Sequence, residues 1–209
     1  MRQFLLMAAL LLLACCGVAP SARADIDDRV VQYLQSQPPE DVLLELPKLT
    51  RVRQWLLADD TRGDPDLDAW KRFAIALRGK PDDEKIGLIQ SEVNRHLRFS
   101  TDLERFGQRD YWETPDEVGS HDCDGYTIFK FWLAHLVGFP YESLALLVGH
   151  LHGTGQMHAV LLIAMDGHDD VLDNLRTGVI SQAAYFMDFR PLVLFTVGSI
   201  AMFTAQGHR

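Results

Sequence analysis

The sequence predicts a single α+β domain in which helices come first and an antiparallel sheet follows. Apolar side chains recur at helical spacing from residue 25 to about residue 97. After Pro140 the period changes, and short aliphatic or β-branched runs are bounded by Gly and Asp. Helical segments followed by closely spaced strand segments are typical of the α+β class.

The first 25 residues have the composition of a leader. Arg2 is followed by an apolar stretch and by the small-residue site Ala22-Arg23-Ala24, which predicts a secretory signal peptide at residues 1–24 and a periplasmic mature domain at residues 25–209. The run Leu12-Leu13-Ala14-Cys15 leaves a second interpretation open, in which the chain is a lipoprotein anchored through Cys15.

The charge balance excludes two classes of partner. Removing residues 1–24 takes away Arg2 and Arg23 and no acidic residue, so 18 Lys and Arg face 29 Asp and Glu, a net charge of −11. Nucleic acids and anionic lipid surfaces are bound by clustered Lys and Arg, so we expect neither as a partner. The remaining length suits one domain, and we expect a monomer.

The helices and strands are predicted in order along the chain. Helices are expected at residues 41–57, 67–77, 81–97 and 122–137, and a loop at residues 105–122 precedes the last of them. The last helix is expected to stop before Pro140, with Gly138 at its C-terminal end. Strands are expected at residues 143–150, 158–165, 170–175 and 191–198.

Cys123 is the only cysteine that remains after cleavage at Ala24, so it has no disulfide partner. It lies in the first turn of the predicted helix, where unpaired backbone N–H groups and the helix dipole favour a thiolate. Asp122 and Asp124 oppose this effect, because neighbouring negative charges raise the pKa of a thiol. We therefore expect either a cationic partner that outweighs the two aspartates or a group that neutralises them.

A histidine and an aspartate come together through a predicted hairpin. The Asp-Gly pair at residues 166–167 is typical of a two-residue turn, and counting back from it places Asp173 on the same face as His158 and diagonal to it. His158 would then deprotonate Cys123 while Asp173 orients the imidazole. Backbone N–H groups at the helix start are candidates for the oxyanion hole.

Two other interpretations of these residues stay open. A lone cysteine at a helix start, a histidine at a sheet rim and an aspartate at a strand end are also common structural residues. Metal binding is the second possibility, because residues 121–124 read His-Asp-Cys-Asp, and His150 and His152 form another group. Neither group has a recognised zinc spacing.

Four motifs, in this order, carry a resemblance to a known family. They are DYWETP at residues 110–115, DCD at 122–124, HAVL at 158–161 and VLDNL at 171–175. With them the chain resembles the bacterial transglutaminase-like cysteine proteinases, the family of LapG-type periplasmic proteases. The resemblance implies a papain-like, transglutaminase-related α+β core with the helices first and the antiparallel sheet packed on the cysteine-bearing helix. It also implies that Cys123 is the nucleophile, His158 the base and Asp173 the third member of a triad.

The same resemblance implies a cofactor and partners. Calcium is expected at the carboxylates that flank the cysteine, Asp122 and Asp124, and Gly125 departs from the acidic residue that the family motif commonly has there. The implied substrate is a large surface adhesin, whose release controls biofilm formation, and the implied regulator is an inhibitory membrane receptor for cyclic-di-GMP. Transglutaminase or amidase chemistry on the same triad, and a non-catalytic peptide-binding module, are the alternatives.

Overall fold

The computed structural model describes residues 40–58, 65–117, 119–197 and 200–202. The predicted signal peptide and Cys15 lie outside these residues. Within the described ranges, none of the helices combines the length and the apolar composition that crossing a bilayer requires.

The long helices lie within two residues of their predicted ends. Asp82, Asp83 and Glu84 occupy the first turn of α4, where the helix dipole favours acidic side chains. Asp122 caps α6, because its carboxylate accepts a hydrogen bond from the Asp124 N–H at 3.2 Å. These helices are α2 (Glu40–Ala58), α3 (Pro65–Leu77), α4 (Asp82–His96) and α6 (Cys123–Leu136).

The segment between α4 and α6 contains short elements that the sequence did not predict. Thr101 and Glu104 form a capping box at the start of α5 (Asp102–Phe106). The strands β1 (Arg98–Phe99) and β2 (Ser120–His121) pair in parallel. This pairing brings residues 98–121 back to the N-terminal end of α6.

The sheet has six strands in the order β6-β5-β4-β3-β7-β8, and every neighbouring pair is antiparallel. The two-residue turn predicted at residues 166–167 is present, since Met165 pairs with His168. A 3-10 turn, η2 (Tyr141–Ser143), leads into the sheet, and α7 (Gln182–Tyr185) follows its edge strand. The strands are β3 (Leu144–Leu151), β4 (Met157–Met165), β5 (His168–Leu172), β6 (Ile180–Ser181), β7 (Phe189–Phe195) and β8 (Ile200–Met202).

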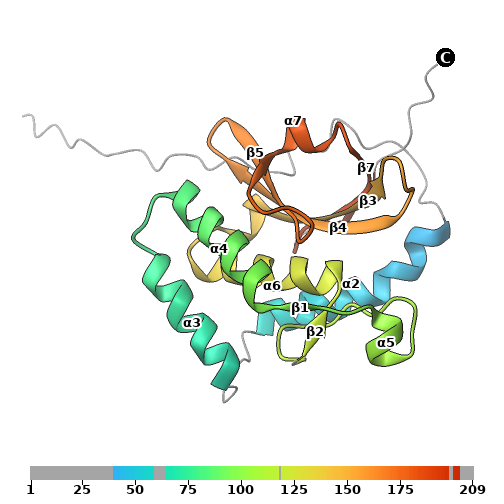
Figure 1. Cartoon of the computed structure of the whole chain (residues 1–209), viewed down its shortest axis with the longest axis horizontal. Coiled ribbons are helices and arrows are strands. Elements are labelled where there is room, and N and C mark those ends of the chain that lie inside the picture. The colour runs from blue at the N-terminus through green and yellow to red at the C-terminus, as the bar shows by residue number, and fades with distance from the viewer. Residues whose placement is uncertain (1–39, 59–64, 118, 198–199, 203–209) are drawn as a thin grey trace, which may run out of the picture.

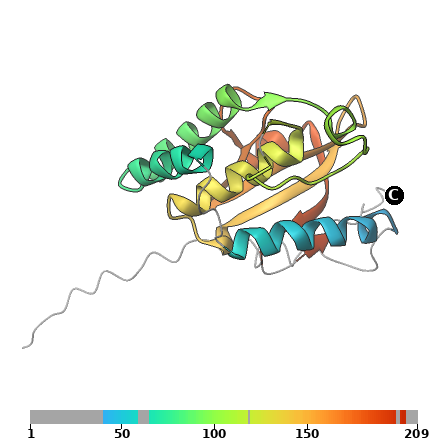
Figure 2. The same cartoon turned by 90° about the horizontal axis from the view of Figure 1, so that it is seen from below.

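The two faces of the sheet are covered by different elements. Figure 1 shows α6 beneath β3 and β4, and α7 over the opposite face, while Figure 2 shows α6 running between α4 and α2. Leu161 and Ile163 belong to the core shared with the helices, and Val160 and Leu162 to the smaller core beneath α7. The fold is therefore the predicted α+β arrangement, with the sheet packed on the cysteine-bearing helix.

Candidate active site

Cys123 is the first residue of α6, and its partly buried thiol lies against β4. The backbone N–H groups of Ala159 and Asp124 lie near enough to the sulfur to favour the thiolate and lower the pKa of the thiol. The Thr127 hydroxyl donates to the Ala159 carbonyl oxygen at 3.0 Å, which joins the first turn of α6 to the same residue of β4. Because Ala159 follows His158, the first turn of α6 packs on the strand that carries that histidine.

His158 and Asp173 form a buried pair, as the hairpin register predicted. The distance from His158 Nε2 to Asp173 Oδ1 is 2.7 Å, and the side chains are only 3% and 1% exposed. A carboxylate accepts but does not donate, so Nε2 carries the proton and Nδ1 is left as the basic nitrogen. β5 ends at Leu172, so Asp173 lies one residue beyond the last paired residue and still reaches the imidazole.

Asp173 is fixed by further donors. Its Oδ1 also accepts from the Leu175 N–H at 2.9 Å, and its Oδ2 accepts from the Tyr185 hydroxyl at 2.9 Å. Burial opposes ionisation of Asp173, but these hydrogen bonds and the one from His158 outweigh it and lower its pKa. The carboxylate is therefore ionised and held in place for the imidazole.

Helix α4 supports the backbone of this aspartate. The side-chain amides of Gln90 and Asn94 donate to the Asp173 carbonyl oxygen at 2.7 and 3.1 Å. Gln90 in turn accepts from the fully buried Lys130 ammonium at 2.7 Å. Burial lowers the pKa of Lys130 to about 7. The sequence alone did not predict a role for Gln90, Asn94 or Lys130.

Four carboxylates gather on the other side of Cys123. One oxygen of each of Asp102, Glu113, Asp122 and Asp124 lies within 4.8 Å of the others, and all but Asp122 are buried. Burial, followed by nearby negative charges, raises the pKa of Asp102 to about 7, and burial with the Asp122 side chain raises the pKa of Asp124. Asp102 Oδ1 and Glu113 Oε2 are buried and have no hydrogen-bond partner in the structure.

This set of groups fits a hard cation. Calcium takes six to eight oxygen ligands, and carboxylates are its usual protein ligands. A bound cation would offset the repulsion among the carboxylates and supply a partner for the two orphaned oxygens. The sequence predicted Asp122 and Asp124 here and missed Asp102 and Glu113, because the latter two are distant in sequence and follow no ligand spacing.

Glu113 explains why residue 125 is glycine. A Cβ atom at position 125 would lie 2.3 Å from Glu113 Oε1 and 2.9 Å from His121 Nδ1. The same Oε1 accepts from His121 Nδ1 at 2.8 Å, and both side chains are buried. The Glu113 carboxylate therefore occupies the space into which a side chain at position 125 would extend, so the cluster keeps a fourth carboxylate despite Gly125.

The acidic cluster also acts on the thiol. Burial and then the negative charge of Asp122 raise the pKa of Cys123 to about 12, against the effect of the Ala159 and Asp124 N–H groups. The helix start alone thus does not produce a thiolate. With the protein groups alone, the thiol stays protonated at neutral pH, and the Asp122 charge is the contribution that a cation would offset.

Comparison with family models decides the family. Residues 76–187, more than half of the chain, match the model of the bacterial transglutaminase-like cysteine proteinases. The chain belongs to this family. The matched range contains Cys123, His158 and Asp173, and the proteinase is accordingly a cysteine peptidase, a hydrolase whose substrates are proteins. A search of curated proteins found no match.

Solved structures share the fold. Calcium-bound LapG from Legionella pneumophila superposes with a TM-score of 0.60 at 21% identity, over 77% of this chain and 91% of that one. EGTA-treated LapG from the same organism gives 0.60 at 20% identity, over 77% and 88%. A further LapG structure gives 0.59 at 22% identity, over 77% and 89%. These matches support the α+β fold predicted from the sequence.

Proposed function

We propose that the proteinase is a periplasmic endopeptidase that cleaves a protein substrate through a thioester formed at Cys123, with His158 as base and Asp173 as the orienting carboxylate. The observation that carries this proposal is the buried His158–Asp173 pair, which belongs to the hairpin on which the first turn of α6 packs. It leaves one basic imidazole nitrogen, Nδ1, which we assign to the Cys123 thiol.

The acylation step uses that nitrogen. His158 Nδ1 takes the Cys123 proton as the sulfur attacks the scissile carbonyl carbon, and a tetrahedral oxyanion forms. The imidazolium is stabilised by the ionised Asp173. It then gives the proton to the leaving amine, the C–N bond breaks, and the acyl group remains on sulfur as a thioester.

Hydrolysis of the thioester repeats these roles. His158 removes a proton from water, the resulting hydroxide attacks the thioester carbon, and a second tetrahedral oxyanion forms. Collapse of that intermediate breaks the C–S bond, releases the carboxylic acid product and returns the proton to sulfur. The N–H groups at the start of α6, where the helix dipole is positive, are suited to hold both oxyanions.

We also propose that the cation of the acidic cluster is calcium, held by Asp102, Glu113, Asp122 and Asp124. The four convergent carboxylates and their two orphaned oxygens support it, as do the solved LapG structures that are named as calcium-bound and EGTA-treated. When bound, calcium would supply positive charge beside the thiol that opposes the effect of Asp122.

The biological setting is proposed from the predicted leader and the LapG-type resemblance. The leader supports secretion to the periplasm, with anchoring through Cys15 as the alternative. The resemblance supports a large surface adhesin as the substrate and an inhibitory membrane receptor as the regulator, which together would control biofilm formation.

A cleavage assay tests the nucleophile. The processed chain, loaded with calcium, is incubated with a candidate adhesin, and the products are identified by mass spectrometry. We expect new N and C termini with the wild type and none with Cys123→Ala. Cleavage by Cys123→Ala would overturn the assignment, and cross-linked or deamidated products in place of new termini would indicate the transglutaminase or amidase alternative.

A further inference from the structure

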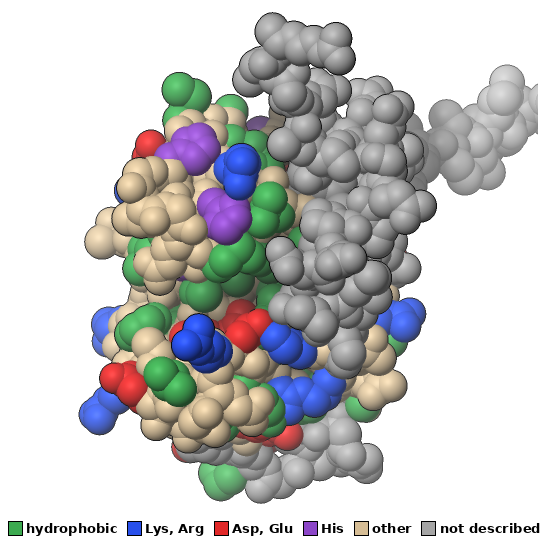
Figure 3. All heavy atoms as spheres, turned by 90° about the vertical axis from the view of Figure 1, so that its right-hand side faces the viewer, with side chains coloured by type: hydrophobic (Ala, Val, Ile, Leu, Met, Phe, Trp, Pro, Cys, Tyr) green, Lys and Arg blue, Asp and Glu red, His purple; other side chains and the backbone are tan. Residues whose placement is uncertain are grey.

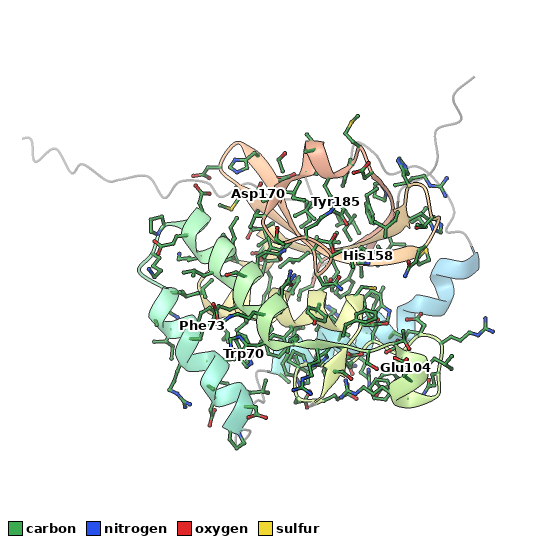
Figure 4. The ribbon with its side chains drawn as sticks, viewed as in Figure 1. Trp70, Phe73, Glu104, His158, Asp170 and Tyr185 are labelled. Atoms are coloured by element: carbon green, nitrogen blue, oxygen red, sulfur yellow. The ribbon has the colours of Figure 1, made fainter. Side chains whose placement is uncertain are left out.

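A shallow pocket lined by two histidines and one arginine lies at the β3–β4 end of the sheet, outside the proposed triad and the acidic cluster. It has a volume of about 560 Å³ and is formed by the β3–β4 turn together with Arg190. His150 and His152 line it, and no acidic residue does. Figure 3 shows histidine and basic side chains gathered on this face above an apolar strip. Arg190 places a positive charge at this pocket in a chain with an expected net charge of −11.

Strand register places the pocket on the approach to Cys123. Met157, His150 and Arg190 are directly paired across β4, β3 and β7, so they form one row on one face. Val148 and Leu161 lie on the same face and pack in the core that α6 covers. Since α6 begins at Cys123, the row lies beyond the helix N-terminus.

The distance from this row to the nucleophile suits a peptide substrate. Ala159, whose N–H lies near the Cys123 sulfur, is two residues from Met157 along β4 and therefore about 7 Å away. His150 lies about 5 Å across from Met157. An extended peptide spans about 3.3 Å per residue, so about four substrate residues bridge the gap.

A β-bulge brings His150 and Arg190 into register with each other. The register between β3 and β7 shifts between Val148 and Gly149, so that His150 faces Arg190. Bulges commonly redirect a side chain next to a functional site. This register sets the imidazole of His150 directly opposite the charged guanidinium of Arg190.

His150 and His152 are tied to the backbone at the edge of the pocket. His150 Nδ1 donates to the Gly155 carbonyl oxygen at 2.9 Å and His152 Nδ1 donates to the Met187 carbonyl oxygen at 3.0 Å, so in the neutral ring each Nε2 is an acceptor, and it becomes a donor to an anion only when the ring is protonated. Among the residues that the structure describes, no carboxylate pairs with Arg190.

The acidic residue next to the pocket already has a partner. Asp188, whose carbonyl oxygen accepts from the His152 N–H, has its carboxylate 3.6 Å from Arg176. That ion pair lies outside the residues that line the pocket, none of which is acidic.

We propose that His150, His152 and Arg190 form a substrate subsite that binds the carboxylate of an Asp or Glu side chain within about four residues of the scissile bond. The inference rests on the proposed peptidase function. It names the substrate class: protein segments with an acidic residue close to the cleaved bond.

The test measures sequence preference without knowing the natural substrate. The calcium-loaded processed chain is incubated with a tryptic peptide library from a bacterial proteome, and mass spectrometry maps the cleaved bonds. Peptides from the best cleaved sites are then made in pairs that carry Asp or Asn at the preferred position. We expect acidic residues to be enriched near the cut, and kcat/KM to be about three- to tenfold higher for the Asp member of each pair.

Two variants test whether Arg190 causes the preference for an acidic residue. In Arg190→Gln the Asp-to-Asn ratio of kcat/KM falls towards one, chiefly through KM, whereas Arg72→Gln, an exposed arginine on α3, keeps the wild-type ratio. Cleavage without acidic enrichment, or an unchanged ratio in Arg190→Gln, overturns the subsite and leaves the peptidase intact. No cleavage of any peptide by the wild type overturns both.

Discussion

The carboxylates on the two sides of Cys123 differ in how completely the protein supplies their hydrogen-bond partners. On the sheet side, both carboxylate oxygens of Asp173 accept hydrogen bonds from protein donors. On the helix side, four carboxylates converge, and Asp102 and Glu113 each keep a buried oxygen without a partner. The protein alone thus completes the orientation of the base, whereas the charge beside the thiol is left for an ion to balance. On the proposed function, the protein itself holds the base in place, and the reactivity of the thiol depends on a bound cation.

The largest expected effect comes from a substitution in the His158–Asp173 pair on the sheet side. In Asp173→Asn the amide donates towards His158 Nε2, so the imidazole proton moves to Nδ1 and the thiol loses its base. We expect kcat for peptide cleavage to fall about 10³-fold or more. Asp68→Asn, at a half-exposed position in the first turn of α3, is the matched control and should cleave like the wild type. Comparable rates for both variants would mean that Asp173 does not orient the base.

Calcium removal tests the helix side. Because the cation binds the folded cluster and not the unfolded chain, calcium at 100 to 1,000 times its Kd should stabilise the fold by about 3–4 kcal/mol. Thermal unfolding of the processed chain in EGTA, and then with added calcium, measures this. In Glu113→Gln the increase in Tm should be much smaller. Identical Tm values with and without calcium in the wild type would contradict the site.

Substitution of Gly125 by Ala tests the packing around Glu113 without changing any charge. In Gly125→Ala the new Cβ would lie 2.3 Å from Glu113 Oε1, so Glu113 must move. We expect a loss of about 1–3 kcal/mol in unfolding free energy, with a reduced calcium response.

Gly87→Ala is the control for this variant. Position 87 lies inside α4, and a Cβ there meets no atom within 4 Å, so the variant should be as stable as the wild type or up to about 1 kcal/mol more stable. A Gly125→Ala variant that matches it in urea denaturation would show that the space is not occupied as described.

The smallest expected effect concerns Tyr185. Tyr185→Phe leaves Asp173 Oδ2 without its 2.9 Å hydrogen bond, which should cost about 1–2 kcal/mol and lower kcat. Tyr141→Phe removes a similar bond, to the Leu56 carbonyl oxygen at 2.8 Å, far along the chain from the triad. It should reduce stability without changing kcat. Equal effects of the two variants on kcat would argue against a role for Tyr185 in holding Asp173.

What the sequence predicted follows from local rules. The helices come from apolar periodicity, and the proximity of His158 and Asp173 comes from one two-residue turn whose register can be counted. Each of these depends on residues close together in the chain. Hence the class of fold and the pairing of base and carboxylate were predictable before any coordinates.

What the sequence did not predict depends on tertiary packing. Asp102 and Glu113 reach the start of α6 only because β1 and β2 pair and fold the intervening segment back, and neither strand has a periodic signal at two residues in length. The sequence also did not predict that burial raises the pKa of Cys123 by more than the helix start lowers it, because burial is a property of the packed structure.

Alkylation of Cys123 is the most direct test of the central claim, because cleavage at Ala24 would leave this residue as the only thiol. The rate of reaction with iodoacetamide at neutral pH is measured in the calcium-loaded processed chain and in His158→Gln, with Tm as a check on folding. The account predicts prompt labelling of the wild type and labelling at least about 10²-fold slower in His158→Gln. Equal labelling of the two folded proteins, or an inert thiol in the wild type, would contradict it.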